Sequence, residues 1–142
     1  MIKKIVLYGA IAAMVLFVAL QLVPYGKDHT NPPVVAEPKW DSPQTRALAK
    51  RACFDCHSSE TVWPWYSSIA PGSWLIYKDV VDGREEYSFS NWDTETKRAR
   101  KFAEVINEGV MPPPQYLLLH PEARLSPEEK QQLIAGFQKS MP

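Results

Sequence analysis

Two cysteines and a histidine stand together in the pattern Cys53-Phe-Asp-Cys56-His57. No other cysteine occurs in the sequence, and a disulfide between residues so close would stabilise little. The C-x-x-C-H spacing is instead the pattern of c-type haem attachment. Two thiols with this spacing at a helix end can reach both vinyl groups of one porphyrin edge, and the adjacent imidazole can bind the iron. The motif predicts one covalent haem c, held by Cys53, Cys56 and His57.

Two other uses of a cysteine pair fit the sequence less well. A structural zinc site needs four ligands, and the sequence has no second cysteine pair. A thioredoxin-like redox motif needs a βαβ context, and no segment shows sustained strand alternation. Haem is therefore the favoured interpretation.

An iron bound by His57 has a second axial position, for which Met111 is the expected ligand. Met111 lies two residues after Gly109 and directly before three prolines, which have fixed φ and no N–H and so hold the loop stiffly. His120 is the rival ligand, since it lies among apolar residues, although it could equally be a hydrogen-bonded structural histidine. An open or water-bound site is the third alternative.

Aromatic residues follow the motif closely, at Trp63, Trp65, Tyr66 and Trp74. They could simply pack in a small core, or one of them could line the haem and donate its indole N–H to a propionate. Arg124 could pair with a propionate as well, because guanidinium groups suit carboxylates, or it could be a solvated charge.

Four stretches carry helix caps or apolar residues at helical spacing. They are residues 43–54, 71–81, a stretch from Asn91 or Asp93 to Gly109, and 126–141. Gly83 is a plausible stop for the second helix, and Ser126 opens the fourth with a capping box. The sequence therefore predicts an all-α fold. The residues expected to face its core are Leu48, Ala49, Ala52, Trp74, Tyr77, Val81, Ala99, Phe102, Ala103, Ile106, Leu133, Ile134, Phe137 and Met141.

An apolar run precedes this domain. Residues 5–24 contain no charge and span roughly 30 Å as a helix, which is the thickness of a bilayer core. Lys3 and Lys4 predict a cytoplasmic N-terminus, so residues 26–142 should lie outside the cytoplasmic membrane, in the periplasm of a cell that has one. A cleaved signal peptide is the competing interpretation, but no A-x-A-like site stands out after the run.

The sequence thus divides into an anchor at 1–25, a tether at 26–41 and a haem-binding domain at 42–142. The tether is polar and contains three prolines, as an extended linker would. His29 lies in it and is expected to be a solvated loop histidine.

Charge excludes one class of partner. The chain carries 16 basic and 16 acidic residues, which is unlike the basic footprint of a nucleic-acid binder. Lipid, through residues 5–24, and membrane redox proteins are the expected partners.

Several short motifs are spread along the chain: Asn31-Pro-Pro, the C-x-x-C-H motif with Ser-Ser-Glu-Thr after it, Trp63-Pro-Trp-Tyr, Ser88-Phe-Ser-Asn-Trp, Met111-Pro-Pro and residues 116–126. With these motifs the sequence resembles the bacterial haem-binding domain family of small anchored proteins. It implies haem binding through Cys53, Cys56 and His57 and a cytochrome c-like helical fold. The family is named for its cofactor, so the resemblance leaves the reaction open.

Electron transfer is the leading functional hypothesis, because a His/Met-ligated iron has no open position for a substrate. The protein is then a carrier and not an enzyme. The rivals are a five-coordinate haem enzyme or sensor, acting on peroxide or a gas, and a relay subunit of a larger membrane redox complex.

Overall fold

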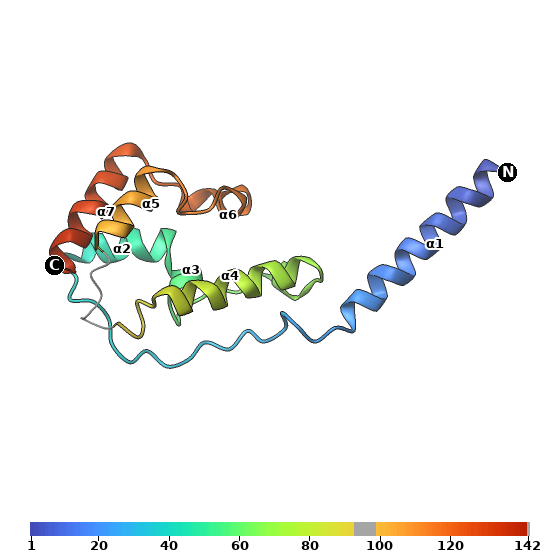
Figure 1. Ribbon diagram of the computed structural model, residues 1–142, viewed down its shortest axis with the longest axis horizontal. Coiled ribbons are helices and arrows are strands. Elements are labelled where there is room, and N and C mark those ends of the chain that lie inside the picture. The colour runs from blue at the N-terminus through green and yellow to red at the C-terminus, as the bar shows by residue number, and fades with distance from the viewer. Residues whose placement is uncertain (93–98, 142) are drawn as a thin grey trace. The chain divides into compact units, whose positions relative to one another are not determined.

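In a computed structural model of the protein, the described residues are 1–92 and 99–141. They form seven α-helices and two 3-10 helices (Figure 1). These are α1 (Ile2–Gln21), α2 (Pro43–Ala52), α3 (Phe54–His57), η1 (Trp65–Ser68), α4 (Gly72–Glu86), α5 (Ala99–Asn107), α6 (Pro114–Leu119), η2 (Pro121–Ala123) and α7 (Pro127–Ser140). Strand-type pairing in this part of the chain is limited to an isolated bridge between Ala36 and Asn91. The predicted all-α class is therefore confirmed.

The chain forms two compact units. Unit 1 consists of Met1–Thr30 and Trp63–Val81, and unit 2 of Asn31–Val62 and Asp82–Pro142. Helix α4 runs through the boundary between the two. The predicted tether is divided as well, because residues 26–30 belong to unit 1 and residues 31–41 to unit 2.

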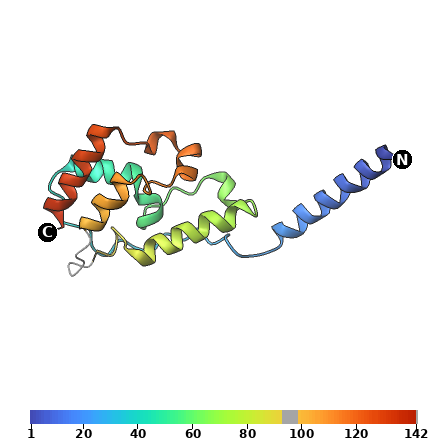
Figure 2. The ribbon, with the colours of Figure 1, turned by 45° about the horizontal axis from the view of Figure 1, so that its top comes forward.

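Unit 2 has a helical core in which α7 packs on both α2 and α5 (Figure 2). Buried aromatic rings of Phe54, Phe89, Phe102 and Phe137 meet at its centre, with centroids 5.0–6.1 Å apart. The half-buried Trp40 packs against this cluster, so the segment before α2 helps to build the core. The other buried apolar residues of the cluster are Leu48, Ala49, Ala52, Ile106, Leu125, Leu133, Ile134 and Met141.

The helix signals in the sequence explain how α2 and α7 begin. Ser42 caps α2 by accepting the N–H of Thr45 at 3.2 Å, and Pro43 occupies the first turn. Ser126 and Glu129 form the predicted capping box of α7. The two helices cross closely at Gly136, where a Cβ atom would lie 2.2 Å from the Thr45 hydroxyl oxygen.

Several helix ends differ from the prediction. Helix α2, the first of the four predicted helices, ends at Ala52 because Cys53 has a non-helical backbone. Helix α3 then begins at Phe54. The prediction that Gly83 ends the second helix is wrong, since α4 continues to Glu86. Gly109 does follow α5, with the left-handed φ of +71° that favours glycine.

Helix α6 and the start of the third predicted helix also need comment. Helix α6 was not predicted, because its short run has a proline start but no capping side chain. Of the two residues considered as caps for the third helix, Asn91 lies in the bridge with Ala36, and Asp93 lies outside the described residues.

Unit 1 contains the apolar N-terminal helix. Helix α1 has 20 residues, a mean hydropathy of 2.0 and no buried residue. It is long and apolar enough to cross a membrane. In the same unit, the predicted core residues Trp74, Tyr77 and Val81 of α4 are half-buried.

Candidate functional site

The imidazole of His57 is buried and held in one orientation. Its Nδ1 lies 2.8 Å from the carbonyl oxygen of Gly83 and 3.4 Å from that of Tyr87. The Tyr87 ring stacks on it in parallel, with centroids 4.1 Å apart and planes 4° apart. Since a carbonyl only accepts, Nδ1 carries the proton and Nε2 is the nitrogen that can bind a metal. Burial lowers the pKa of His57, which favours the neutral, metal-binding form.

Gly83 makes this contact possible because it has no side chain. A Cβ atom on Gly83 would lie 2.5 Å from the carbonyl oxygen of Cys56, closer than any real Cβ contact. This tight packing against the motif explains why a glycine stands inside α4 without ending it. The helix passes over the motif and supplies a backbone acceptor to His57.

The two thiols are presented from one helical turn. Cys53 is the N-cap of α3 and Cys56 lies within it, so the two thiols stand three positions apart at one short helical turn. Both cysteines are half-buried, and no disulfide joins them. Desolvation raises the pKa of the Cys53 thiol to about 12.

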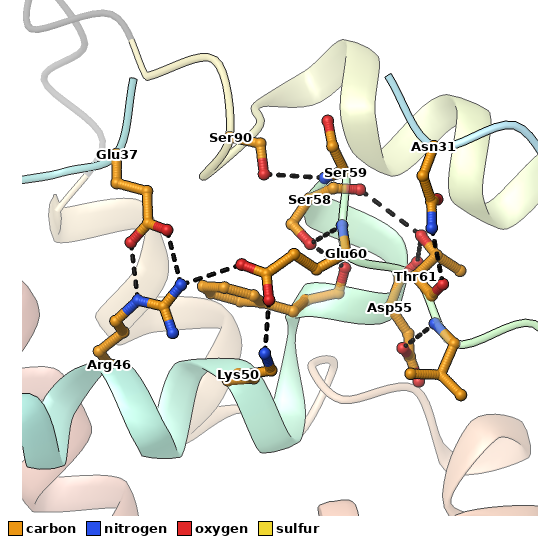
Figure 3. A network of polar contacts seen from close by, with 12 residues as sticks. Asn31, Glu37, Arg46, Lys50, Asp55, Ser58, Ser59, Glu60, Thr61 and Ser90 are labelled. Carbon is orange, nitrogen blue, oxygen red and sulfur yellow. Dashed lines mark hydrogen bonds and ion pairs between the residues drawn. The ribbon is translucent and has the colours of Figure 1, made fainter. Parts of the chain in front are cut away.

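The segment after His57 is fixed by a dense polar network (Figure 3). Arg84 of α4 donates to the carbonyl oxygen of Ser58 at 2.8 Å and to the Thr61 hydroxyl at 2.9 Å. Asp55, inside the motif, accepts the N–H of Val62 at 3.0 Å, and its carbonyl accepts the Thr61 hydroxyl at 2.7 Å. The chain therefore folds back on the motif and leaves the His57 backbone little freedom. The roles of Arg84 and Gly83 were not predicted from the sequence, because both depend on residues more than 20 positions away.

Helix α6 is attached to the same motif. The hydroxyl of Tyr116 donates to the Asp55 carboxylate at 2.6 Å. Burial and this bond raise the pKa of Tyr116. The ring of His120 stacks on Tyr116 with centroids 4.2 Å apart, and His120 Nδ1 lies 3.0 Å from the Glu122 carboxylate. His120 therefore lies on an element that contacts the motif.

The candidate sixth ligands have different surroundings. Met111 is half-buried on the loop between α5 and α6, where its N–H donates to the carbonyl oxygen of Val105 at 3.1 Å. Met141 is 5% exposed in the core, as predicted. His29, in unit 1, was predicted to be solvated. It instead stacks on Trp63, with ring centroids 4.4 Å apart, and its Nε2 contacts the carbonyl oxygen of Ser67 at 3.2 Å.

The side chains considered as propionate partners differ in their exposure. In unit 1, the indole N–H groups of Trp63 and Trp74 are buried and have no hydrogen-bond partner among the described residues. Arg124 is exposed, as is Trp65. A role for any of these side chains toward a propionate stays a prediction.

The residues of the motif fit a haem. A thiol pair on one helical turn stands beside a neutral imidazole whose Nδ1 is already bound, which is the donor set of a haem-attachment site in an all-α protein. A family model described as a haem-binding domain matches residues 15–139. The chain therefore belongs to the haem-binding domain family, and the predicted resemblance is confirmed. No curated protein and no solved structure matched the chain.

Proposed function

We propose that this protein is a single-haem c-type cytochrome that is anchored in the cytoplasmic membrane and transfers electrons on its outer side. The observation that carries the proposal is the fixed imidazole of His57 beside the Cys53 and Cys56 thiols. Membership of the haem-binding domain family supports haem as the cofactor. When bound, the haem supplies one-electron chemistry at its iron.

The protein residues have separate tasks in this proposal. Cys53 and Cys56 would hold the haem covalently, and His57 would bind its iron through Nε2. The Gly83 carbonyl fixes the tautomer and the plane of the imidazole, as outer hydrogen-bond partners of metal ligands do. Met111 is the proposed sixth ligand, and the stiffness of its proline-rich loop supports this assignment.

An electron carrier is favoured over an enzyme because His57 and Met111 together would leave the iron no open position for a substrate. One observation keeps His120 as an alternative ligand. Its Nδ1 contact with the Glu122 carboxylate resembles the carboxylate–histidine pairs that orient metal ligands.

The membrane part of the proposal depends on α1. It carries Lys3 and Lys4 in its first turn and is uncharged from Ile5 to its end. The positive-inside rule then directs the N-terminus to the cytoplasm and residues 26–142 to the outside. Haem attachment and a membrane redox partner would both be on that side.

Covalent attachment is tested on a denaturing gel, since thioether bonds survive denaturation. The protein is made in a strain with c-type haem maturation and stained for haem. The wild type should keep the stain, and the double variant Cys53→Ser, Cys56→Ser should lose it. Gln138→Ser, at an exposed position of α7, is the control and should keep it. Covalent haem in the double cysteine variant would contradict the proposal.

A further inference from the structure

The end of α1 is attached to the rest of unit 1 by a pair of hydrogen bonds. The side-chain amide of Gln21 donates to the carbonyl oxygen of Ala70 at 3.0 Å and accepts the Ala70 N–H at 2.9 Å. Ala70 is 1% exposed. Gln21 is the single amide side chain of the N-terminal apolar run, and it binds the backbone of Ala70. This pair of bonds holds the turn before α4 against the end of α1.

Further contacts fix the start of α4 at the same place. The rings of Tyr25 and Tyr77 meet edge to face, with centroids 5.3 Å apart. Gly26 has a φ of +79°, and a Cβ atom there would lie 2.8 Å from the carbonyl oxygen of Ser73. The Lys27 ammonium donates to the carbonyl oxygen of Gln21 and so satisfies a carbonyl that the end of α1 leaves open.

The segment fixed in this way has an unusual composition. Residues 63–77 include three tryptophans and two tyrosines but no charged residue, in a chain that is 23% charged. Several of its large side chains are exposed, with Trp65 at 78%, Leu75 at 55% and Ile69 at 37%. Scattered exposed apolar residues are ordinary on a soluble protein, but these are concentrated in a segment attached to the end of an apolar helix.

We infer that residues 63–77 form a membrane-interface surface, which lies among the lipid headgroups on the outer side of the bilayer that α1 spans. This inference rests on the proposed membrane anchorage. Tryptophan and tyrosine are enriched at the membrane–water interface because they combine an apolar ring with a polar end, and Trp65 is the exposed tryptophan of this segment. The absence of charge lets this surface enter the interface without desolvating an ion.

The occupant is lipid because the surface continues the apolar helix. The Gln21 amide lies where α1 leaves the hydrocarbon, and its polar atoms are already bonded to Ala70. Leu22, at 79% exposed, and Tyr25, at 49%, lie between α1 and the surface in the chain. The bilayer contact of this unit would therefore extend beyond the spanning helix.

Photo-crosslinking of the full-length, haem-loaded protein in phosphatidylcholine vesicles tests this inference. A photoreactive benzoylphenylalanine is placed at Trp65 or, as the control, at Leu118 of unit 2, which is equally exposed at 78%. Mass spectrometry should find lipid adducts at position 65 at a yield several-fold above position 118. Equal yields at both positions, or a crosslink to a second copy of the chain at position 65, would overturn the inference.

The variant Gln21→Leu tests the attachment itself. It removes the amide pair but leaves an apolar helix end, so the chain should stay in the membrane while the lipid yield at position 65 falls several-fold. An unchanged yield would contradict the role of the amide pair. With Gln21 unchanged, a soluble chain that begins near residue 25 would show that the anchorage has failed, whereas an intact membrane-bound chain without lipid adducts at position 65 would defeat this inference alone.

Discussion

The carbonyl oxygen of Gly83 connects two parts of the motif at the scale of single residues. It accepts the Nδ1 proton of His57, while the absent side chain of Gly83 lets α4 lie directly on the Cys56 carbonyl. Gly83 alone therefore makes both contacts. A larger residue at position 83 would have to displace either α4 or the turn that carries both thiols.

We expect Gly83→Ala to lower the free energy of unfolding by about 1–3 kcal/mol, as overpacking does. The added Cβ would meet the Cys56 backbone, which cannot rotate away as a side chain can. Gly72→Ala is the matched control in the same helix, because a Cβ there has nothing within 4 Å. It should be neutral or stabilise by up to about 1 kcal/mol. Denaturant unfolding measures both, and equal stabilities would show that the close contact is unimportant.

The choice between Met111 and His120 is a second question at this scale. If Met111 binds the iron, the oxidised protein should show the weak near-infrared sulfur–iron band. Met111→Ala should abolish the band and let the reduced protein bind carbon monoxide, while His120→Ala should leave the band intact. Loss of low-spin character in His120→Ala alone would assign the ligand to His120. A wild type that already binds carbon monoxide readily would favour an open-site enzyme or sensor.

At the scale of elements, α2 connects the chain before it to the segment after the motif. The Arg46 guanidinium binds the Glu37 carboxylate through two hydrogen bonds, at 2.6 and 2.7 Å, and reaches Glu60 at 2.9 Å (Figure 3). The indole N–H of Trp40 also donates to Glu37, at 2.8 Å. The segment 31–41 is thus a packed part of unit 2.

The stability that Glu37 contributes should depend on pH. Its hydrogen bonds with Arg46 hold the pKa of the Glu37 carboxyl below the ordinary 4.5. A lowered folded-state pKa stabilises the fold above pH 4.5, and this contribution is lost as the pH falls through the folded value. Glu37→Gln should therefore cost up to about 1 kcal/mol at pH 7 and much less at pH 3. Glu108→Gln, at an exposed position of the chain, is the control for urea unfolding at both pH values.

At the scale of the whole molecule, the proposed anchor would decide where the haem-binding domain works. A retained helix limits the protein to partners at or in the membrane, whereas a cleaved signal would release a diffusing carrier. The surface proposed for residues 63–77 adds a second lipid contact to unit 1.

Protease treatment of spheroplasts tests this topology. Lys3 and Lys4 at the start of α1, with no charged residue in the rest of the helix, predict an inside N-terminus. Added protease should therefore digest the domain, and membrane pellets from untreated cells should contain the intact chain. A domain that is digested only after the cells are lysed would place it in the cytoplasm and contradict the proposal.

Local signals in the sequence determined much of this fold. The caps at Ser42 and Ser126 depend on residues three positions away, and the end of α5 depends on the positive φ of Gly109. The buried faces of α2, α5 and α7 follow from the helical period. The C-x-x-C-H motif is itself a local pattern, so the candidate haem-binding residues could be named from the sequence.

The tertiary structure decided what surrounds these residues. His57 and Gly83 are 26 positions apart, and Asp55 and Tyr116 are 61 apart. His29 became a stacked, hydrogen-bonded residue only through its contacts with Trp63 and Ser67. Caps and helical periods report on residues within one or two turns, whereas each of these contacts depends on how distant segments pack. The sequence by itself therefore determined which residues can hold a haem, and packing decided which backbone atoms orient them.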